Sequence, residues 1–418
     1  MIEAAGLLSP ARILREVYLM KIFSRLVLPL LALFVLAAAG CSKPELRCAS
    51  PEDNPRHHYS VGMDLLEQGD ISGASEKFER ALWCDKKFAP GYAGAAIAGA
   101  LGAVAMEPGK ARDNRADKAF DDLKASYGRS VTADDEFASH IADIRVNTAL
   151  MPKGWLKEAE SAYRKSMKLK VDENSILYYD GREAASYFMG LAYLEAREFQ
   201  VARDRFADAL AHRREGKWNE KADLAWKRTD KIVRALSGIT LGYIGNEIAV
   251  KGSVSRGDMA ALLVDELKID KLFAGRIPVK SEVDKLKAGS VPADVEQSPF
   301  KHEILVLMKW GVRGLEPDSG GLFSPEKPVI RKDFAFVLED VLIKLTGDET
   351  MSSAYFGHQR SPFPDVQASS AWYNAIMNVT TRNVMETELS GEFRPDEDVD
   401  GAEAILAIRV LKQRLNIY

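Results

Sequence analysis

The strongest constraint on the fold is a spacing of small and aromatic residues that occurs twice in the first half of the chain. In both segments a glycine precedes an alanine by 12 residues, a phenylalanine follows 4 residues later, and a second alanine follows 3 residues after that. Small residues at fixed positions let paired helices approach closely, and the aromatic ring fills the space beside them, so the spacing predicts stacked helical hairpins. The positions are Gly62, Ala74, Phe78 and Ala81 in residues 55–88, and Gly190, Ala202, Phe206 and Ala209 in residues 183–216.

This spacing resembles that of tetratricopeptide repeats. Residues 89–96 and 155–167 are suggestive of two further units, whereas segments 107–150 and 168–182 are interpreted as connections longer than a standard turn. The resemblance predicts a helical-hairpin solenoid over residues 55–225 whose concave face binds a protein partner. A generic helical bundle remains the alternative.

The last third of the chain repeats a different unit. Three stretches each place Val or Ile at the end of a loop and an acidic residue one turn into an amphipathic helix, at residues 254–267, 329–342 and 399–411. Upstream of the second and third stretches, the sequences "PADV" and "FPDV" each open an apolar segment, and "GLFSP" and "GEFRP" each close a loop. The corresponding aspartates are 71 residues apart and the corresponding loop phenylalanines 70 residues apart, so these are tandem repeats.

These features resemble the S-layer homology domain. The resemblance covers roughly residues 240–418 and implies three pseudo-repeats in a pseudo-three-fold helical bundle that binds cell-wall glycan or peptidoglycan. We assign residues 226–418 to this domain and expect an all-α chain overall. The first repeat is degenerate, and residues 226–245, which continue from the solenoid, are expected to supply its first helix.

The resemblance also implies which residues bind the glycan. An acidic sugar requires a planar and permanently charged donor, which arginine provides, and sugar rings pack on aromatic faces. Asp258 and Asp333 are expected to cap helices, and Gly401 replaces the arginine of the third repeat. A core position for Trp310 remains open. The glycan-binding residues implied by the resemblance are Arg256, Arg331, Trp372, Trp310 and Phe300.

The N-terminus reads as an export signal. Lys21 and Arg25 precede an apolar run of 15 residues, too short at about 1.5 Å each to cross a hydrocarbon core of about 30 Å. The run ends in "AAGC", which resembles a bacterial lipobox. That resemblance implies a signal peptide over 1–40, a lipid on Cys41 and a tether over 41–54; an ordinary cleavage site is the alternative. The signal is complete from Met20, so either methionine could start the chain.

Two cysteines remain besides the lipidation site. An exported chain occupies a compartment that permits disulfides, so we expect Cys48 and Cys84 to pair and to hold the tether against an early helix. Two buried thiols are the alternative. Ser42 follows the lipidation site, and a residue other than aspartate there favours outer-membrane sorting by resemblance to that pathway, with the body facing the periplasm.

Composition narrows the function further. The 57 basic residues nearly balance the 61 acidic residues, so we expect no nucleic-acid partner. Catalytic motifs are missing, and we expect a protein that is not an enzyme and uses no cofactor. The sequence "DEDVDG" opens like a calcium loop with Asp396, Asp398 and Asp400, but alanine occupies the twelfth position, where a calcium loop has glutamate. We therefore expect an envelope lipoprotein that organises the wall, or alternatively an assembly factor for polysaccharide or protein export.

Overall fold

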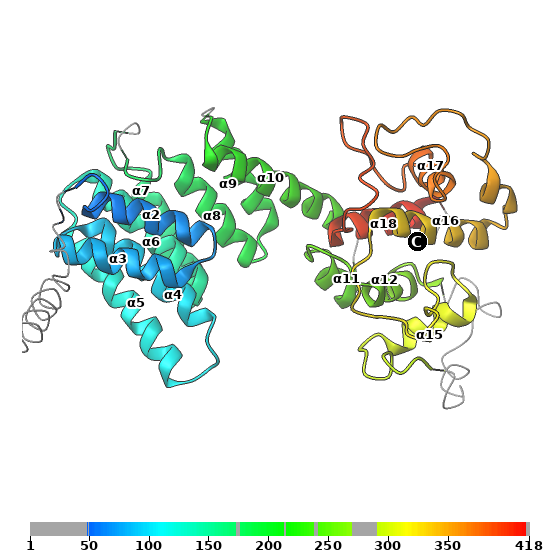
Figure 1. The fold of residues 1–418 in the computed structure, drawn as a ribbon, viewed down its shortest axis with the longest axis horizontal. Helices are drawn as coiled ribbons and strands as arrows, with labels where there is room; N and C mark the ends of the chain where they lie inside the picture. Colours follow the sequence, from blue (N-terminus) through cyan, green and yellow to red (C-terminus); the bar gives the residue numbers. More distant parts are fainter. Residues whose placement is uncertain are drawn as a thin grey trace, which may run out of the picture.

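The protein is all-helical over the residues that the computed structural model describes, with no β-strand among them. The structure describes residue 48 and residues 50–172, 176–212, 215–237, 241–269 and 291–414. Figure 1 shows an N-terminal unit, built from α2 to α10, and a C-terminal unit, built from α11 to α18, with α10 running between them. The expected signal peptide over 1–40 and the lipidation site at Cys41 lie outside the described residues.

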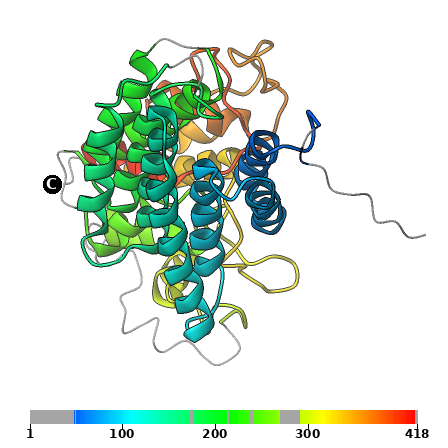
Figure 2. The same cartoon turned by 90° about the vertical axis from the view of Figure 1, so that its left-hand side faces the viewer.

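The N-terminal unit is a row of helices in which each helix packs mainly on its neighbours in the chain. Figure 2 shows these helices running side by side. The helices are α2 (Pro55–Glu67), α3 (Ile71–Cys84), α4 (Ala89–Val104), α5 (Lys110–Arg129), α6 (Ala133–Leu150), α7 (Trp155–Ser166), α8 (Glu183–Glu195), α9 (Phe199–Ala211) and α10 (Lys217–Leu236).

Local capping explains where several of these helices begin. The side chain of Asn54 accepts a hydrogen bond from the backbone N–H of His57 at 2.9 Å, and proline follows at the first helical position of α2. Asp70 accepts from the N–H of Gly73 at 2.9 Å and caps α3. A short polar side chain before an apolar run therefore sets these boundaries.

The repeated glycine-to-phenylalanine spacing has a direct packing reason. A Cβ atom built on Gly62 would lie 2.7 Å from the ring of Phe78, and a Cβ atom on Gly190 would overlap the ring of Phe206. Both rings are fully buried. Helices α2 and α3, and likewise α8 and α9, thus approach each other at a position that only glycine permits.

Segment 107–150 differs from the connection expected from sequence. It forms α5 and α6, and α4 packs against both. Thr132 starts α6 with a capping box: it accepts from the N–H of Asp135, whose carboxylate accepts from the N–H of Thr132, both at 3.1 Å. The prediction missed these helices because they lack the glycine and phenylalanine positions of the two clear units.

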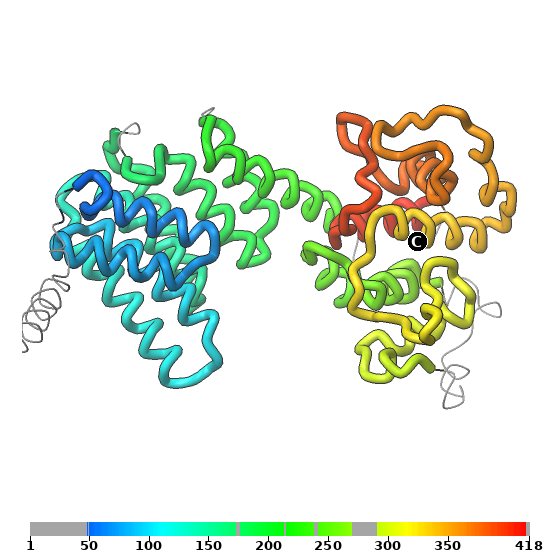
Figure 3. The backbone as a smooth tube through the Cα atoms, viewed as in Figure 1, coloured from blue at the N-terminus to red at the C-terminus, as the bar shows by residue number. Residues whose placement is uncertain are grey.

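The C-terminal unit contains shorter helices separated by long loops, whose path is clearest in the tube view of Figure 3. The helix α12 continues as a π-helical turn, η1, and a 3-10 turn, η2, follows α16. The elements are α11 (Tyr243–Ile248), α12 (Arg256–Ala261), η1 (Leu262–Glu266), α15 (Lys301–Trp310), α16 (Arg331–Thr346), η2 (Glu349–Ser353), α17 (Tyr373–Thr381) and α18 (Gly401–Arg414).

Helix α10 belongs to both units. Its early residue Trp218 is buried in the core of the N-terminal unit, whereas Ile232 and Ala235 are buried in the core of the C-terminal unit. The boundary that we placed at residues 225/226 falls within this single helix. The two hydrophobic cores are therefore joined by one continuous element.

Candidate glycan-binding site and the repeat framework

Three loop ends meet at the centre of the C-terminal unit. The N–H of Val254 donates to the carbonyl oxygen of Val399, the N–H of Val399 donates to that of Val329, and the N–H of Val329 donates to that of Val254, each at 2.9 Å. All three valines are buried. This closed cycle places the starts of α12, α16 and α18 around a common point.

Two aspartates hold the loops that lead into this cycle. Asp294 accepts from the N–H groups of Phe323 and Ser324 at 3.1 and 2.6 Å. One repeat later, Asp365 accepts from the N–H groups of Phe393 and Arg394 at 3.0 and 2.6 Å. The residue after each phenylalanine has a φ of 57° or 56°, so the carboxylates stabilise a left-handed turn. These two aspartates therefore cap turns of the loops.

Arg256 is committed to the protein backbone. Its Nε donates to the carbonyl oxygen of Phe323 at 2.8 Å, and its Nη1 and Nη2 donate to those of Gly314 and Glu316 at 2.8 and 2.9 Å. Burial lowers the pKa of the guanidinium from its ordinary value. The side chain that we expected to contact glycan instead holds the loop of the next repeat.

Arg331 makes the equivalent set of contacts from a deeper position. The residue is 2% exposed, and its Nε and Nη2 donate to the carbonyl oxygens of Phe393 and Glu386 at 2.7 and 2.9 Å. Its Nη1 pairs with the carboxylate of Glu403. Burial, followed by the charge of Arg394, lowers the pKa of Arg331 to about 10, so it remains charged at neutral pH. The side chain that we expected to contact glycan therefore holds the loop of the next repeat from a buried position.

In the third repeat, Gly401 stands at the position that corresponds to Arg256 and Arg331. Backbone atoms of another segment of the chain fill the space beside it. Its N–H donates to the carbonyl oxygen of Lys251 at 2.9 Å, and a Cβ atom on Gly401 would overlap the carbonyl oxygen of Ile248. The adjacent Asp400 pairs with Lys231 of α10 at 3.1 Å. Glycine replaces arginine here because α10 and α11 pack where a long loop lies in the other two positions.

The three aromatic candidates are all partly buried. Phe300 and Trp310 are partly buried and pack against the hydrophobic core, and the ring of Phe300 lies beside Gly257. Trp372 is partly buried as well, but its Nε1 donates to Asp333 at 3.2 Å and the ammonium of Lys332 lies 4.7 Å from its ring centroid. Asp333 therefore positions Trp372 and does not form the side-chain cap that we expected.

We refer to Trp372, Lys332 and Asp333 as the tryptophan patch. The patch combines an aromatic ring with a lysine whose ammonium also forms an ion pair with the exposed Asp396. Sequence reasoning missed Lys332, although its position directly after Arg331 at a helix start was a usable signal. The patch offers a ring for packing on a sugar and polar groups for its hydroxyls.

The three aspartates of the calcium-like sequence do not converge. Asp396 pairs with Lys332, Asp398 accepts from the hydroxyl of Ser253 at 2.9 Å, and Asp400 pairs with Lys231. Three carboxylates that face three different partners cannot share one cation. In the described part of the chain, the His, Cys, Asp and Glu groups close enough for a metal are the two cysteines of the disulfide and Asp53.

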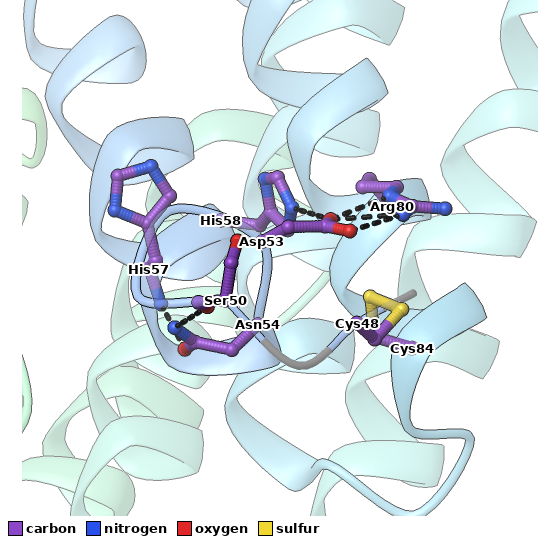
Figure 4. The surroundings of a disulfide bond; sticks show 8 residues. All are labelled: Cys48, Ser50, Asp53, Asn54, His57, His58, Arg80 and Cys84. Atoms are coloured by element: carbon purple, nitrogen blue, oxygen red, sulfur yellow. Dashed lines mark hydrogen bonds and ion pairs between the residues drawn. A yellow bond between two sulfur atoms is a disulfide. The ribbon is translucent and has the colours of Figure 1, made fainter. Parts of the chain in front are cut away.

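The N-terminal start of the described chain is held covalently. Cys48 and Cys84 form a disulfide with Cα atoms 5.4 Å apart, which joins the segment before α2 to the end of α3 (Figure 4). Nearby, Asp53 accepts from Arg80 at 2.7 to 3.0 Å and contacts His58 at 2.8 Å. Arg80, and then His58, holds the pKa of Asp53 below its ordinary value.

Comparisons with known proteins place one segment in a family. Residues 362–405 match the family model described as the S-layer homology domain, and this segment contains Asp365, Phe393 and Gly401. No curated protein and no solved structure matches the chain. Across the described residues, none of the helices has the length and apolar character needed to cross a membrane. The match indicates association with the cell envelope and its glycans.

Proposed function

We propose that this protein is an envelope lipoprotein that binds cell-wall glycan or peptidoglycan through its C-terminal unit. The observation that carries the proposal is the family match over residues 362–405. It is supported by the repetition of the same framework, an aspartate on a turn and an arginine on a loop carbonyl, around Asp294 and Arg256. The C-terminal unit is then a pseudo-three-fold domain of which the matched segment is the third repeat.

The glycan-contacting surface in this proposal is the tryptophan patch. Trp372 supplies a ring for stacking, and Lys332 supplies a cation beside it, whereas the guanidinium groups of Arg256 and Arg331 donate to loop carbonyl oxygens of the fold. The junction position at Gly401 is covered by α10 and α11 and contributes no groove. Binding is thus centred on the interface between the second and third repeats.

The N-terminal unit is proposed as a tetratricopeptide-like solenoid that binds a protein partner. Its support is the paired contact of Gly62 with Phe78 and of Gly190 with Phe206. A lipid at Cys41 would hold the protein on the membrane, in the outer membrane facing the periplasm. Because Cys48 is tied to Cys84, the free tether from Cys41 spans at most about 25 Å at ~3.5 Å per residue, half the reach that an untied tether would have.

The proposed role is binding and organisation, with no catalysis. The alternative is an assembly or scaffold factor for polysaccharide or protein export, in which the C-terminal unit is only a docking surface. The burial of Arg331 favours this alternative, since it removes one expected glycan ligand.

Retention of the full chain on purified sacculi separates the two functions. We expect the wild-type chain to sediment with sacculi, and Trp372→Ala and Lys332→Ala each to reduce retention at least fivefold. Trp83→Ala is the matched control, since Trp83 is 58% exposed on α3 of the N-terminal unit. If neither the wild-type chain nor any variant sediments with sacculi, the docking function is favoured. If all variants are retained as well as wild type, the tryptophan patch is excluded as the binding site.

A further inference from the structure

Two exposed apolar side chains lie at one end of the N-terminal unit. Trp83, in the last turn of α3, is 58% exposed, and Val131, in the connection between α5 and α6, is 89% exposed. The connections after α3 and after α5 lie against each other, because Nε of Arg129 donates to the carbonyl oxygen of Lys86 at 3.2 Å. We call this surface the Trp83–Val131 end.

The expected lipid anchor is tied to the same end. Cys84, the residue after Trp83, is bonded to Cys48 (Figure 4). The chain from Cys41 to Cys48 spans at most about 25 Å at ~3.5 Å per residue. A lipid on Cys41 would therefore keep the Trp83–Val131 end within that distance of the bilayer.

The ring of Trp83 is held by the segment that leads from the disulfide into α2. Asp53 of this segment accepts from Nε and Nη2 of Arg80 at 2.7 to 3.0 Å. The guanidinium carbon of Arg80 lies 4.3 Å from the centroid of the Trp83 ring, a cation–π contact. Arg80 thus positions the ring from one side while more than half of the residue stays exposed, so less conformational entropy is lost when the ring meets a partner.

The charges around the two apolar side chains balance. Residues 85–88 and 129–135 contain three basic and three acidic residues, and Glu52 and Arg56, both exposed, add one of each near the start of α2. The Trp83–Val131 end is therefore not a surface that attracts anionic lipid through its charge. Contact with a bilayer has to come from the apolar side chains. The balanced set is Lys86, Lys87 and Arg129 with Asp85, Asp134 and Asp135.

We infer that the Trp83–Val131 end rests on the membrane, with both side chains in the headgroup region; this inference rests on the lipid of the proposed function. Tryptophan is enriched at membrane–water interfaces because its ring is apolar and its N–H polar. Two side chains suffice because the tether makes the contact intramolecular, which raises the effective concentration of the bilayer. Figure 1 shows α3 and α5 on the side of the molecule away from the C-terminal unit. The contact would thus direct the C-terminal unit away from the membrane and toward the wall.

The test couples the protein to a vesicle through Cys41. The chain from Cys41 onward keeps every described residue, and pairing of Cys48 with Cys84 leaves Cys41 as the remaining thiol of the three cysteines. A maleimide-bearing lipid in phosphatidylcholine vesicles then supplies the anchor whether or not the cell lipidates the protein. Phosphatidylcholine with bromine on the upper part of its acyl chains quenches tryptophans that reach the bilayer. We expect quenching that stays constant from about 50 to 500 mM salt, because the contact is apolar.

Two variants locate the contact. Trp83→Phe should lower the quenched emission at least threefold, and Val131→Asp, which places a charge in the contact, should lower it at least twofold. The matched controls lie on α10, away from this end: Trp226→Phe removes another tryptophan, and Leu224→Asp adds the same charge at a residue that is 69% exposed. Both controls should be quenched as wild type.

Three outcomes would overturn the inference. They are an absence of quenching, equal quenching of wild type and Trp83→Phe, and quenching that falls at least twofold at high salt, which would assign the contact to charge. Mass spectrometry of the native protein from membranes tests the lipid on Cys41 separately. A lipidated protein without the vesicle contact would keep the proposed function and lose this surface, whereas a protein without lipid would refute the anchor and leave the vesicle result unchanged.

Discussion

Arg331 donates its Nε–H to the carbonyl oxygen of Phe393 at 2.7 Å, and its guanidinium carbon lies 4.7 Å from the centroid of the same residue's ring. Arg256 and Phe323 repeat the relationship at 2.8 and 4.6 Å. Each arginine therefore binds one phenylalanine through both its backbone and its ring. The contact fastens the loop of one repeat onto the helix start of the repeat before it.

Replacement of Arg331 should destabilise the C-terminal unit. Arg331→Ala leaves the partly buried carboxylate of Glu403 without its cation and two carbonyl groups without their donors, so we expect a loss of about 3–5 kcal/mol in the free energy of unfolding. Urea denaturation followed by circular dichroism measures it. Arg256→Ala should have a smaller effect, because its hydrogen-bond partners are all carbonyls. A stability of Arg331→Ala within 1 kcal/mol of wild type would contradict the structural role.

Substitution of Gly401 should disturb the packing of α18 against α11, next to the end of α10. In Gly401→Ala the new Cβ atom would overlap the carbonyl oxygen of Ile248, and overpacking of this kind costs about 1–3 kcal/mol or more. We expect a lower melting temperature and faster proteolysis near the end of α10. Gly320→Ala is the control, because Gly320 lies in a loop where the nearest atom, a carboxylate oxygen of Asp318, can move. Equal melting temperatures for both variants would refute the close approach at Gly401.

Removal of the disulfide should destabilise the N-terminal unit. Cys48 and Cys84 close a loop with a sequence separation of 36, and a cross-link over that length stabilises the native state by about 3–4 kcal/mol in the chain-entropy account. We expect Cys84→Ser to lower the free energy of unfolding by that amount. Addition of a reductant should then shift the denaturation midpoint of wild type but not that of the variant. A reductant effect in neither protein would show that the bond does not stabilise the fold.

Acidification should destabilise the N-terminal unit through His140. This residue is 5% exposed on α6, its Nδ1 lies 2.7 Å from the hydroxyl of Tyr127, and burial, followed by the charge of Lys165, lowers its pKa from 6.5 to about 4. Between these values the unfolded chain binds a proton that the folded chain does not. The free energy of unfolding therefore falls as the pH is lowered from about 6.5 toward 4.

The pH dependence is checked by urea midpoints at pH 7.5, 6 and 5. His140→Asn keeps a donor for Tyr127 without a titratable ring, so its midpoint should vary less over this range. Burial raises the pKa of the neighbouring Asp143, whose effect on the free energy of unfolding has the opposite sign. An identical slope in wild type and variant would assign the effect to another group.

Much of the architecture was predictable because it depends on local or repeated patterns. The contact between Gly62 and Phe78 is encoded in a spacing of 16 residues, and the same spacing recurs at Gly190 and Phe206. The pairing of Cys48 with Cys84 followed from their number and the expected compartment. Helices α5 and α6 were missed because their small residues follow no such pattern.

The candidate site was predictable in part. The sequence pattern indicated that Arg331 and Trp372 are important positions, but it could not indicate which side of the helix start each one faces. Arg331 points inward because the loop carbonyls of Phe393 and Glu386 lie within its reach, and those residues are more than 50 positions away. Trp372 is partly buried and lies beside Lys332.

The sequence by itself determined that the chain is helical, that its two halves repeat different units, and where the repeat positions fall, because helix periodicity and packing of small against aromatic residues are short-range properties. Only the tertiary structure decided that the guanidinium groups of Arg256 and Arg331 serve the fold, that Gly401 lies against the carbonyl of Ile248, and that Arg80 joins the ring of Trp83 to Asp53. These features arise where distant segments dock, and the free energy of docking depends on the combined shape and charge of both surfaces.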